Sequence, residues 1–251
     1  NPKKPKWDGR DYFVLSNGHI CPLMYASMAN AGYFPKKELL TLRKLGTRLQ
    51  GHPHREALPG LETTSGPLGS GLSQACGMAL GLKLDKKKNL VFVSLGDGEQ
   101  NEGNHWEAMM FAAKNKLDNV IGITDRNYIQ IDGNTEDIMP LDSLAEKYRA
   151  FNWNVVEIDG NDMKQVLRTL TRARKNKGKP LMIIANTIPG KGIDFMENKH
   201  EWHGKPPKPE EGDLALNEIH AHEVELRGDW IRKHRKFKPL HVGLKKIKKK
   251  K

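Results

Sequence analysis

The chain has 251 residues, of which 37% are hydrophobic, which is enough for one globular domain with a buried core. No apolar run reaches the roughly 18 residues that a membrane-spanning helix needs, and the basic N-terminus is not followed by the apolar stretch of a secretory signal. Two cysteines are too few for a disulfide framework, so we expect two buried thiols and a cytoplasmic protein.

The net charge of +12 is concentrated near the end of the chain. Residues 244–251 contain six lysines, and removing them halves the net charge. Such a run is usually a solvated tail. We therefore expect one domain over residues 1–215 and a basic tail over residues 216–251. A dedicated nucleic-acid-binding function is disfavoured, because no recognised nucleic-acid motif accompanies the charge.

Helical and strand patterns alternate along the rest of the chain. Short β-branched apolar runs predict buried strands, and apolar residues at three- and four-residue spacing predict helices. In chain order, these patterns predict a helix over residues 70–84, a strand over 89–95, a helix over 104–117, strands over 119–124 and 154–158, a helix over 162–175 and a strand over 180–185. The alternation indicates an α/β fold with an open, mainly parallel sheet and helices on both faces.

A glycine-rich segment, Gly96-Asp97-Gly98, follows one predicted strand and precedes a helix, and Asn127 follows the next strand. The crossover between these strands brings both segments to one sheet edge, where ligands bind in such folds. Glycines let the backbone approach an anion, and oxygen atoms of Asp97, Asn127 and the Ile129 carbonyl are the ligands that Mg²⁺ or Ca²⁺ requires. Gly-Asp-Gly alone is more often an ordinary turn, so Asn127 provides most of the support for a metal-binding site.

This spacing resembles the thiamine-diphosphate and metal motif of the transketolase family. Further segments resemble the same family in the same order, and together they cover about residues 8–210. These segments are Ser16-Asn17-Gly18-His19, Gly51-His52-Pro53, Glu62-Thr63-Thr64-Ser65-Gly66-Pro67-Leu68-Gly69-Ser70-Gly71, Asp132-Gly133, Gly190-Lys191-Gly192 and His203-Gly204.

The resemblance implies a thiamine-diphosphate-binding fold with Mg²⁺ or Ca²⁺ held by Asp97, Asn127 and the Ile129 carbonyl. It implies cofactor contacts from Gly66, Leu68, Gly96, Gly98 and Glu102, the last near the cofactor or a subunit contact. It also implies that His19, His52 and His203 face the substrate and the cofactor, with His200 as an alternative to His203. Lys191 lies between glycines at a predicted strand end, where a phosphate contact is expected.

Most of the ten histidines have no such context. We expect ordinary surface residues at five positions, namely His105, His220, His222, His234 and His241. Arg48 and Arg55 flank His52, and solvated charge is the simpler interpretation for both. Trp106 and the methionines near it are expected in the core.

The family's pyrimidine-binding domain supplies a glutamate that activates the cofactor, and nothing after Glu211 resembles it. About 40 residues could not form such a domain. We therefore predict either the N-terminal subunit of a split, hetero-oligomeric transketolase, with that domain and glutamate in a C-terminal partner subunit, or a fragment of a longer chain, and we favour the split form. It would transfer a two-carbon ketol unit between sugar phosphates. A component of a 1-deoxyxylulose-phosphate synthase or a 2-oxo-acid decarboxylase is the alternative, and a basic nucleic-acid-binding module is a weaker one.

Overall fold

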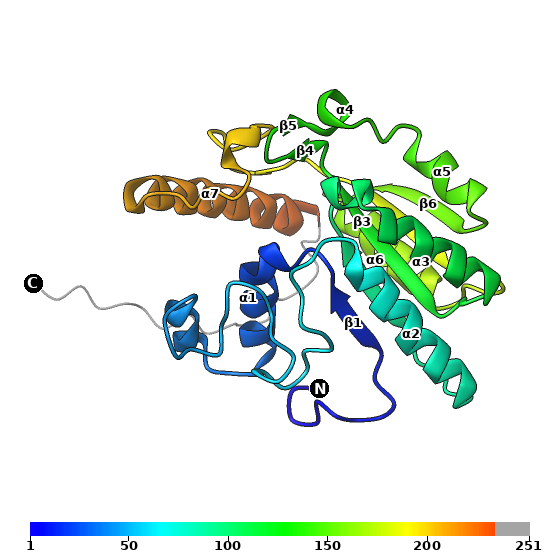
Figure 1. The fold of residues 1–251 in the computed structure, drawn as a ribbon. Helices are drawn as coiled ribbons and strands as arrows, with labels where there is room; N and C mark the ends of the chain where they lie inside the picture. Colours follow the sequence, from blue (N-terminus) through cyan, green and yellow to red (C-terminus); the bar gives the residue numbers. More distant parts are fainter. Residues whose placement is uncertain (234–251) are drawn as a thin grey trace, which may run out of the picture.

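The computed structural model describes residues 1–233 and contains a five-stranded parallel sheet (Figure 1). The strand order is β1-β2-β3-β7-β6. The strands are β1 (Tyr12–Leu15), β2 (Val91–Leu95), β3 (Val120–Arg126), β6 (Asn154–Asp159) and β7 (Leu181–Asn186). Every neighbouring pair in this sheet is parallel, which confirms the predicted fold class.

Helices cover both faces of the sheet, as predicted. Alternate residues of β7 point to opposite faces, so Met182 and Ile184 join one hydrophobic cluster while Leu181 and Ile183 join another. The first cluster lies under α2 (Ser70–Leu84), α3 (Gly103–Lys114) and α5 (Leu144–Ala150), and the second lies under α6 (Met163–Ala173). The central strands are therefore apolar on both sides, as is usual for a buried parallel sheet.

A third cluster forms around α1 (Cys21–Ala31) and the 3-10 helix η2 (Lys36–Thr41), beside the sheet (Figure 1). The Tyr25 hydroxyl donates to the Gln50 carbonyl at 2.9 Å, which ties α1 to the long connection that follows. This cluster therefore supports the loop that carries His52 and Gly66. Cys21 belongs to it and Cys76 to the α2 side of the sheet, and both thiols are buried, as predicted.

The remaining elements surround the carboxyl ends of the strands. They are the 3-10 helices η1 (Gly18–Ile20), η3 (Gly98–Asn101) and η4 (His200–Trp202), the strands β4 (Ile129–Gln130) and β5 (Gly133–Asn134), the short helix α4 (Thr135–Ile138) and the long helix α7 (Pro209–Lys233).

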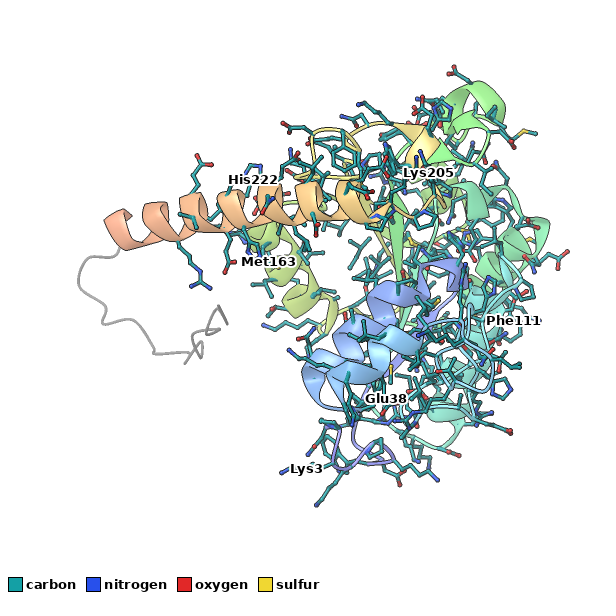
Figure 2. The ribbon with its side chains drawn as sticks, turned by 90° about the vertical axis from the view of Figure 1, so that its left-hand side faces the viewer. Lys3, Glu38, Phe111, Met163, Lys205 and His222 are labelled. Atoms are coloured by element: carbon teal, nitrogen blue, oxygen red, sulfur yellow. The ribbon has the colours of Figure 1, made fainter. Side chains whose placement is uncertain are left out.

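Helix α7 extends away from the sheet (Figures 1 and 2). The predicted boundary between residues 215 and 216 falls inside this helix, and the lysine run over residues 244–251 lies outside the described residues. No helix within residues 1–233 is both long and apolar enough to cross a bilayer.

Candidate active site

The predicted site residues gather at one edge of the sheet because the strands are parallel. Leu95 at the end of β2 pairs with Thr124 of β3, and Arg126 at the end of β3 pairs with Asn186 of β7. The chain leaves each strand on the same side, into the segments that begin at Ser16, Gly96 and Asn127. The carboxyl edge thus brings together motifs that are far apart in sequence.

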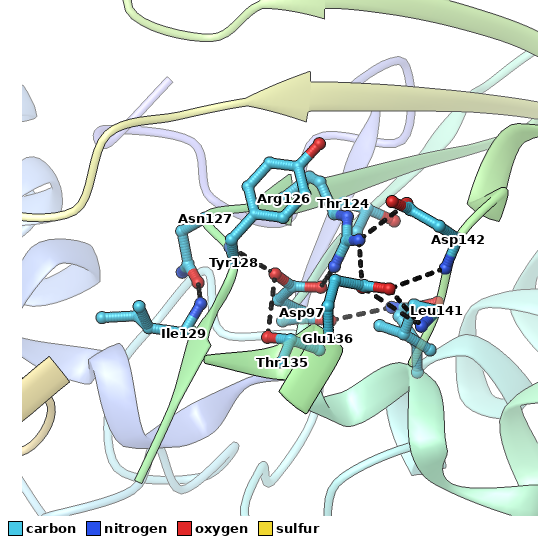
Figure 3. Close-up of polar contacts among 12 residues, drawn as sticks. Asp97, Thr124, Arg126, Asn127, Tyr128, Ile129, Thr135, Glu136, Leu141 and Asp142 are labelled. Atoms are coloured by element: carbon cyan, nitrogen blue, oxygen red, sulfur yellow. Dashed lines mark hydrogen bonds and ion pairs between the residues drawn. The ribbon is translucent and has the colours of Figure 1, made fainter. Parts of the chain in front are cut away.

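Asp97 lies at the centre of this edge and is only 2% exposed. Its Oδ1 accepts from the Arg126 guanidinium at 2.7 Å, and its Oδ2 accepts from the Tyr128 backbone N–H at 2.6 Å (Figure 3). The Thr135 hydroxyl also donates to Oδ2, at 3.4 Å. Burial raises the pKa of the Asp97 carboxyl, and the bonds from Arg126 and Tyr128 oppose that shift.

The segment 127–129 wraps around this carboxylate. Tyr128 has a left-handed backbone, with φ of 63°, which is uncommon for a residue other than glycine. The Ile129 N–H donates to Asn127 Oδ1 at 3.1 Å and fixes the orientation of that amide. The three predicted metal ligands, Asp97, Asn127 and Ile129, therefore lie on two segments joined by the bond from Tyr128 to Asp97.

These residues fit a hard divalent cation. Within residues 1–233 no three histidine, cysteine, aspartate or glutamate side chains are grouped as metal ligands. A metal at Asp97 would therefore take the rest of its ligands from the Asn127 amide, a main-chain carbonyl and diphosphate oxygens, all of which suit Mg²⁺ or Ca²⁺. Arg126 is already bound to the Asp97 carboxylate and would compete with the metal.

Arg126 is a site residue that the sequence analysis missed. Its side chain is 1% exposed and contacts three carboxylates, those of Asp97, Glu136 and Asp142. Its guanidinium carbon also lies 4.0 Å from the centre of the Tyr128 ring. Although burial opposes it, the bonds to Glu136 and Asp97 raise the pKa of Arg126. A charged residue at the end of an otherwise apolar strand is the signal that could have identified it.

Glu99 is a second missed residue, in the same turn as Asp97 and equally buried. Its Oε1 accepts from the Ser16 hydroxyl and from the Gly69 N–H, the latter at 2.7 Å. Its Oε2 accepts from the Gly96 N–H at 2.8 Å. This carboxylate therefore joins the end of β1, the turn before α2 and the glycine turn, which we define as residues 96–103.

Gly69 shows why this junction needs glycine. Its φ is +78°, and a Cβ atom there would lie 2.1 Å from the Asn104 amide oxygen. The backbone of the Gly69 turn thus packs directly on the start of α3. Any larger residue would separate the Gly69 turn from the glycine turn.

The three predicted site histidines come together at the same edge. The ring centres of His19 and His203 are 6.1 Å apart, and His52 is near enough to influence the pKa of His19. We call these three residues the histidine cluster. His200 instead lies 3.8 Å from Glu201, so the geometry favours His203 over His200 as the member of the cluster.

The surroundings of two members of the histidine cluster, His19 and His203, favour the neutral imidazole. Burial, and after it the neighbouring rings of His203 and His52, lower the pKa of His19. Burial also lowers the pKa of His203, against the opposing charge of Asp125. A neutral imidazole has one donor and one acceptor nitrogen, which suits hydroxyl groups of a sugar.

The other predicted contacts are placed as follows. Gly66 lies beside the histidine cluster, since a Cβ atom there would lie 3.9 Å from His52 Cγ. Leu68 is half-buried in the same loop, and a Cβ atom on Gly98 would meet the Gln130 amide at 2.9 Å. Glu102 is exposed where the glycine turn meets α3, and Lys191 forms an ion pair with Glu197 at 3.0 Å. Their contacts to the cofactor remain predictions.

His105 corrects one expectation, because it is not a surface residue. Its side chain is fully buried in α3, with Nε2 at 3.2 Å from the Tyr148 hydroxyl. Burial lowers its pKa to about 4. Trp106 packs against the core and Met109 is buried within it, as predicted, whereas Met110 is exposed. Arg48 is exposed and pairs with Glu38 at 2.9 Å.

The fold and this edge define a class of α/β domain that binds a diphosphate-containing cofactor beyond the ends of parallel strands. Residues 1–225 match the thiamine diphosphate binding domain of transketolase, and the chain belongs to the transketolase family. This match confirms the resemblance found from the sequence motifs.

Several relatives are subunits rather than complete single chains. The chain is 43% identical over 219 residues to the 6-deoxy-6-sulfo-D-fructose transketolase subunit SqwG of Clostridium sp. (strain MSTE9), covering 87% of this chain and 80% of that protein. It is 40% identical to an apulose-4-phosphate transketolase subunit of Phocaeicola vulgatus, covering 87% and 77% of the two chains. This chain therefore matches more than three-quarters of the length of each of these two relatives.

Single-chain transketolases are much longer than this chain. The rat transketolase is 40% identical over 227 residues, which are 88% of this chain but 34% of that protein. The crystal structure of transketolase from Campylobacter jejuni superposes with a TM-score of 0.82 at 33% identity, covering 86% of this chain and 35% of that one. The chain therefore spans about a third of the single-chain members that it matches.

Proposed function

We propose that this chain is the cofactor-binding subunit of a split transketolase, which transfers a two-carbon ketol unit between sugar phosphates. The observation that carries the proposal is the similarity to transketolase subunits over more than three-quarters of their length. The convergence of the histidine cluster and Asp97 at one sheet edge supports it, because ketol transfer needs substrate hydroxyl contacts next to the cofactor.

In this proposal, Asp97, Asn127 and the Ile129 carbonyl would hold a divalent metal, and Gly98 would let the backbone approach the diphosphate. Bound thiamine diphosphate supplies the chemistry that breaks and forms the carbon–carbon bond. His19 and His203 exchange hydrogen bonds with substrate hydroxyls, in which their neutral rings act as donor or acceptor.

We further propose that a partner subunit covers this edge and contributes the pyrimidine-binding domain with its catalytic glutamate. Apolar side chains are exposed next to the cofactor edge, with Ile131 75% and Met139 57% exposed. The Met139 carbonyl accepts from Asn101 at 3.4 Å, so Met139 lies beside the glycine turn. Exposed apolar groups beside a polar site are typical of a surface that a partner protein buries.

The binding half of the proposal is tested by calorimetry. The chain is titrated with thiamine diphosphate at fixed Mg²⁺, with and without a candidate C-terminal subunit. We expect metal-dependent binding that tightens with the partner and is lost in Asp97→Asn. Circular dichroism checks that this variant is folded. Binding that does not change in Asp97→Asn would contradict the metal site.

The reaction is tested on the reconstituted pair of subunits. Xylulose 5-phosphate, apulose 4-phosphate and 6-deoxy-6-sulfo-D-fructose serve as ketol donors, with ribose 5-phosphate among the acceptors. We expect turnover of at least one donor. Turnover of pyruvate with glyceraldehyde 3-phosphate, and of no ketose, would replace this proposal with the 1-deoxyxylulose-phosphate synthase alternative.

A further inference from the structure

The charge around Asp97 is already balanced in part by Arg126. The guanidinium binds Asp97 Oδ1 through one terminal nitrogen, and through the other it binds Asp142 at 2.9 Å and Glu136 (Figure 3). Arg126 and Asp97 are both almost fully buried, while Asp142 is exposed and Glu136 is partly buried. One buried cation is thus shared between a carboxylate of the cofactor site and two carboxylates nearer the surface.

Of the two outer carboxylates, Glu136 is anchored independently of Asp97. Glu136 accepts from the backbone N–H groups of Leu141, at 3.1 and 3.2 Å, and of Asp142, at 3.2 Å. Although burial opposes it, the bond from Arg126 and these N–H groups lower the pKa of Glu136. Glu136 therefore remains an ionised partner for Arg126 when the bond to Asp97 is broken.

A divalent cation at Asp97 would change this balance. It would lie within a few ångströms of the guanidinium, where two positive charges in a poorly solvated site repel strongly. Arg126 also lines a pocket together with Asp142, Glu157 and Asn186, so the pocket lies on the side of Arg126 where its outer partner Asp142 is found. Asp97 Oδ2, in contrast, already faces the segment that contains Asn127 and Ile129.

We propose that Arg126 is the counter-ion of Asp97 in the metal-free chain and that it moves onto Glu136 and Asp142 when the metal binds. Metal loading would then be coupled to the position of residues 135–142. Arg126 is a positioning residue in this scheme, because it acts on the site through Asp97. The inference rests on the proposed metal site.

The test measures Mn²⁺ binding by electron paramagnetic resonance, with thiamine diphosphate present. Arg126→Met removes the competing charge, so we expect Mn²⁺ to bind at least about tenfold more tightly than to the wild-type chain. Asp97→Asn abolishes binding in both backgrounds. Equal or weaker binding by Arg126→Met would overturn the counter-ion role while leaving the metal site intact.

A second pair of variants gives an answer even if Arg126→Met does not fold. Glu136→Gln takes an outer partner from Arg126, so the guanidinium stays on Asp97 and Mn²⁺ binding weakens about threefold. Asp137→Asn is the matched control, because it removes the same charge one residue away and Asp137 is exposed. Equal effects of the two variants would overturn the inference. If neither the wild-type chain nor Arg126→Met binds Mn²⁺ even with the partner subunit present, the metal site itself is wrong.

Discussion

The glycine turn and the histidine cluster lie at the same edge of the sheet but satisfy their polar groups differently. Asp97 and Glu99 are buried, and both oxygens of each carboxylate accept bonds from protein donors. Within residues 1–233, by contrast, none of the three imidazoles of the histidine cluster makes a side-chain hydrogen bond. His52 is exposed, and the protein covers only part of His19 and of His203.

The difference separates groups that set the geometry of the site from groups that are free to contact a ligand. A buried carboxylate must be satisfied by the protein, since an unpaired one costs several kcal/mol. Its partners then fix its position and that of the turns that supply them. A half-exposed imidazole can hydrogen-bond to water until a ligand binds, at little cost in free energy. We therefore propose that Glu99 positions the turns around it and that the histidine cluster contacts the substrate.

Glu99→Gln should give the largest effect on stability if this division is correct. The amide nitrogen of glutamine must face at least one of the present donors, which leaves the buried Gly69 N–H or the partly buried Gly96 N–H without an acceptor. The loss of the buried negative charge relieves part of this cost. We expect a net destabilisation of about 2 kcal/mol, measured by urea unfolding.

Glu102→Gln is the matched control, since it removes the same charge from the same turn at an exposed position. We expect a change of less than about 0.5 kcal/mol. If the two variants were equally stable, Glu99 would not hold the turns together, and the proposed contrast between the two regions would lose its main support.

His105→Gln tests a buried residue of α3, just after the glycine turn, through the pH dependence of the free energy of unfolding. Because the pKa of His105 in the folded chain is about 4, below its unfolded value near 6.5, unfolding takes up a proton between these values. Stability is therefore complete above pH 6.5 and falls as the pH drops toward 4. Between pH 6.5 and pH 5 this single group removes about 1.5 kcal/mol.

The variant should lose this part of the acid sensitivity, while its stability at pH 7 reports only the altered packing. Urea unfolding at pH 7 and pH 5 measures both. His54→Gln serves as the control because His54 is exposed, and its pH dependence should match that of the wild-type chain. An unchanged slope in His105→Gln would show that another group carries the acid sensitivity.

Most of the sheet was predictable because its central strands are apolar on both faces. The helix expected over residues 70–84 has those bounds in the structure, and the predicted strands differ by at most two residues at either end. Strand β1 was missed because it has only four residues and one of them, Phe13, is exposed. Helix α7 was missed because apolar residues such as Leu214 and Leu226 face solvent and leave no clear stripe.

The site was predictable as a set of motifs but not as a network. The order of the motifs and the parallel topology together imply a common edge for Asp97 and Asn127. The contacts of Arg126 reach Asp97, Glu136 and Asp142, at separations of 29, 10 and 16 residues, which no local pattern specifies. The same holds for Glu99 and for the burial of His105, because tertiary packing decides which polar groups lose contact with water.

The smallest expected effect tests the histidine cluster by comparing His203→Ala with His200→Ala. The two residues belong to one short segment, and only His203 lies in the histidine cluster. A neutral imidazole that hydrogen-bonds a substrate hydroxyl contributes about 1 kcal/mol, so kcat/KM for the best ketol donor should fall about five- to tenfold in His203→Ala. His200→Ala should change it less than twofold, since its ring lies beside Glu201. Cofactor binding, measured by calorimetry, should stay unchanged in both, which separates a substrate contact from a positioning role. The reverse order of the two variants would place His200 at the substrate and would mean that the cluster rearranges when the partner subunit binds.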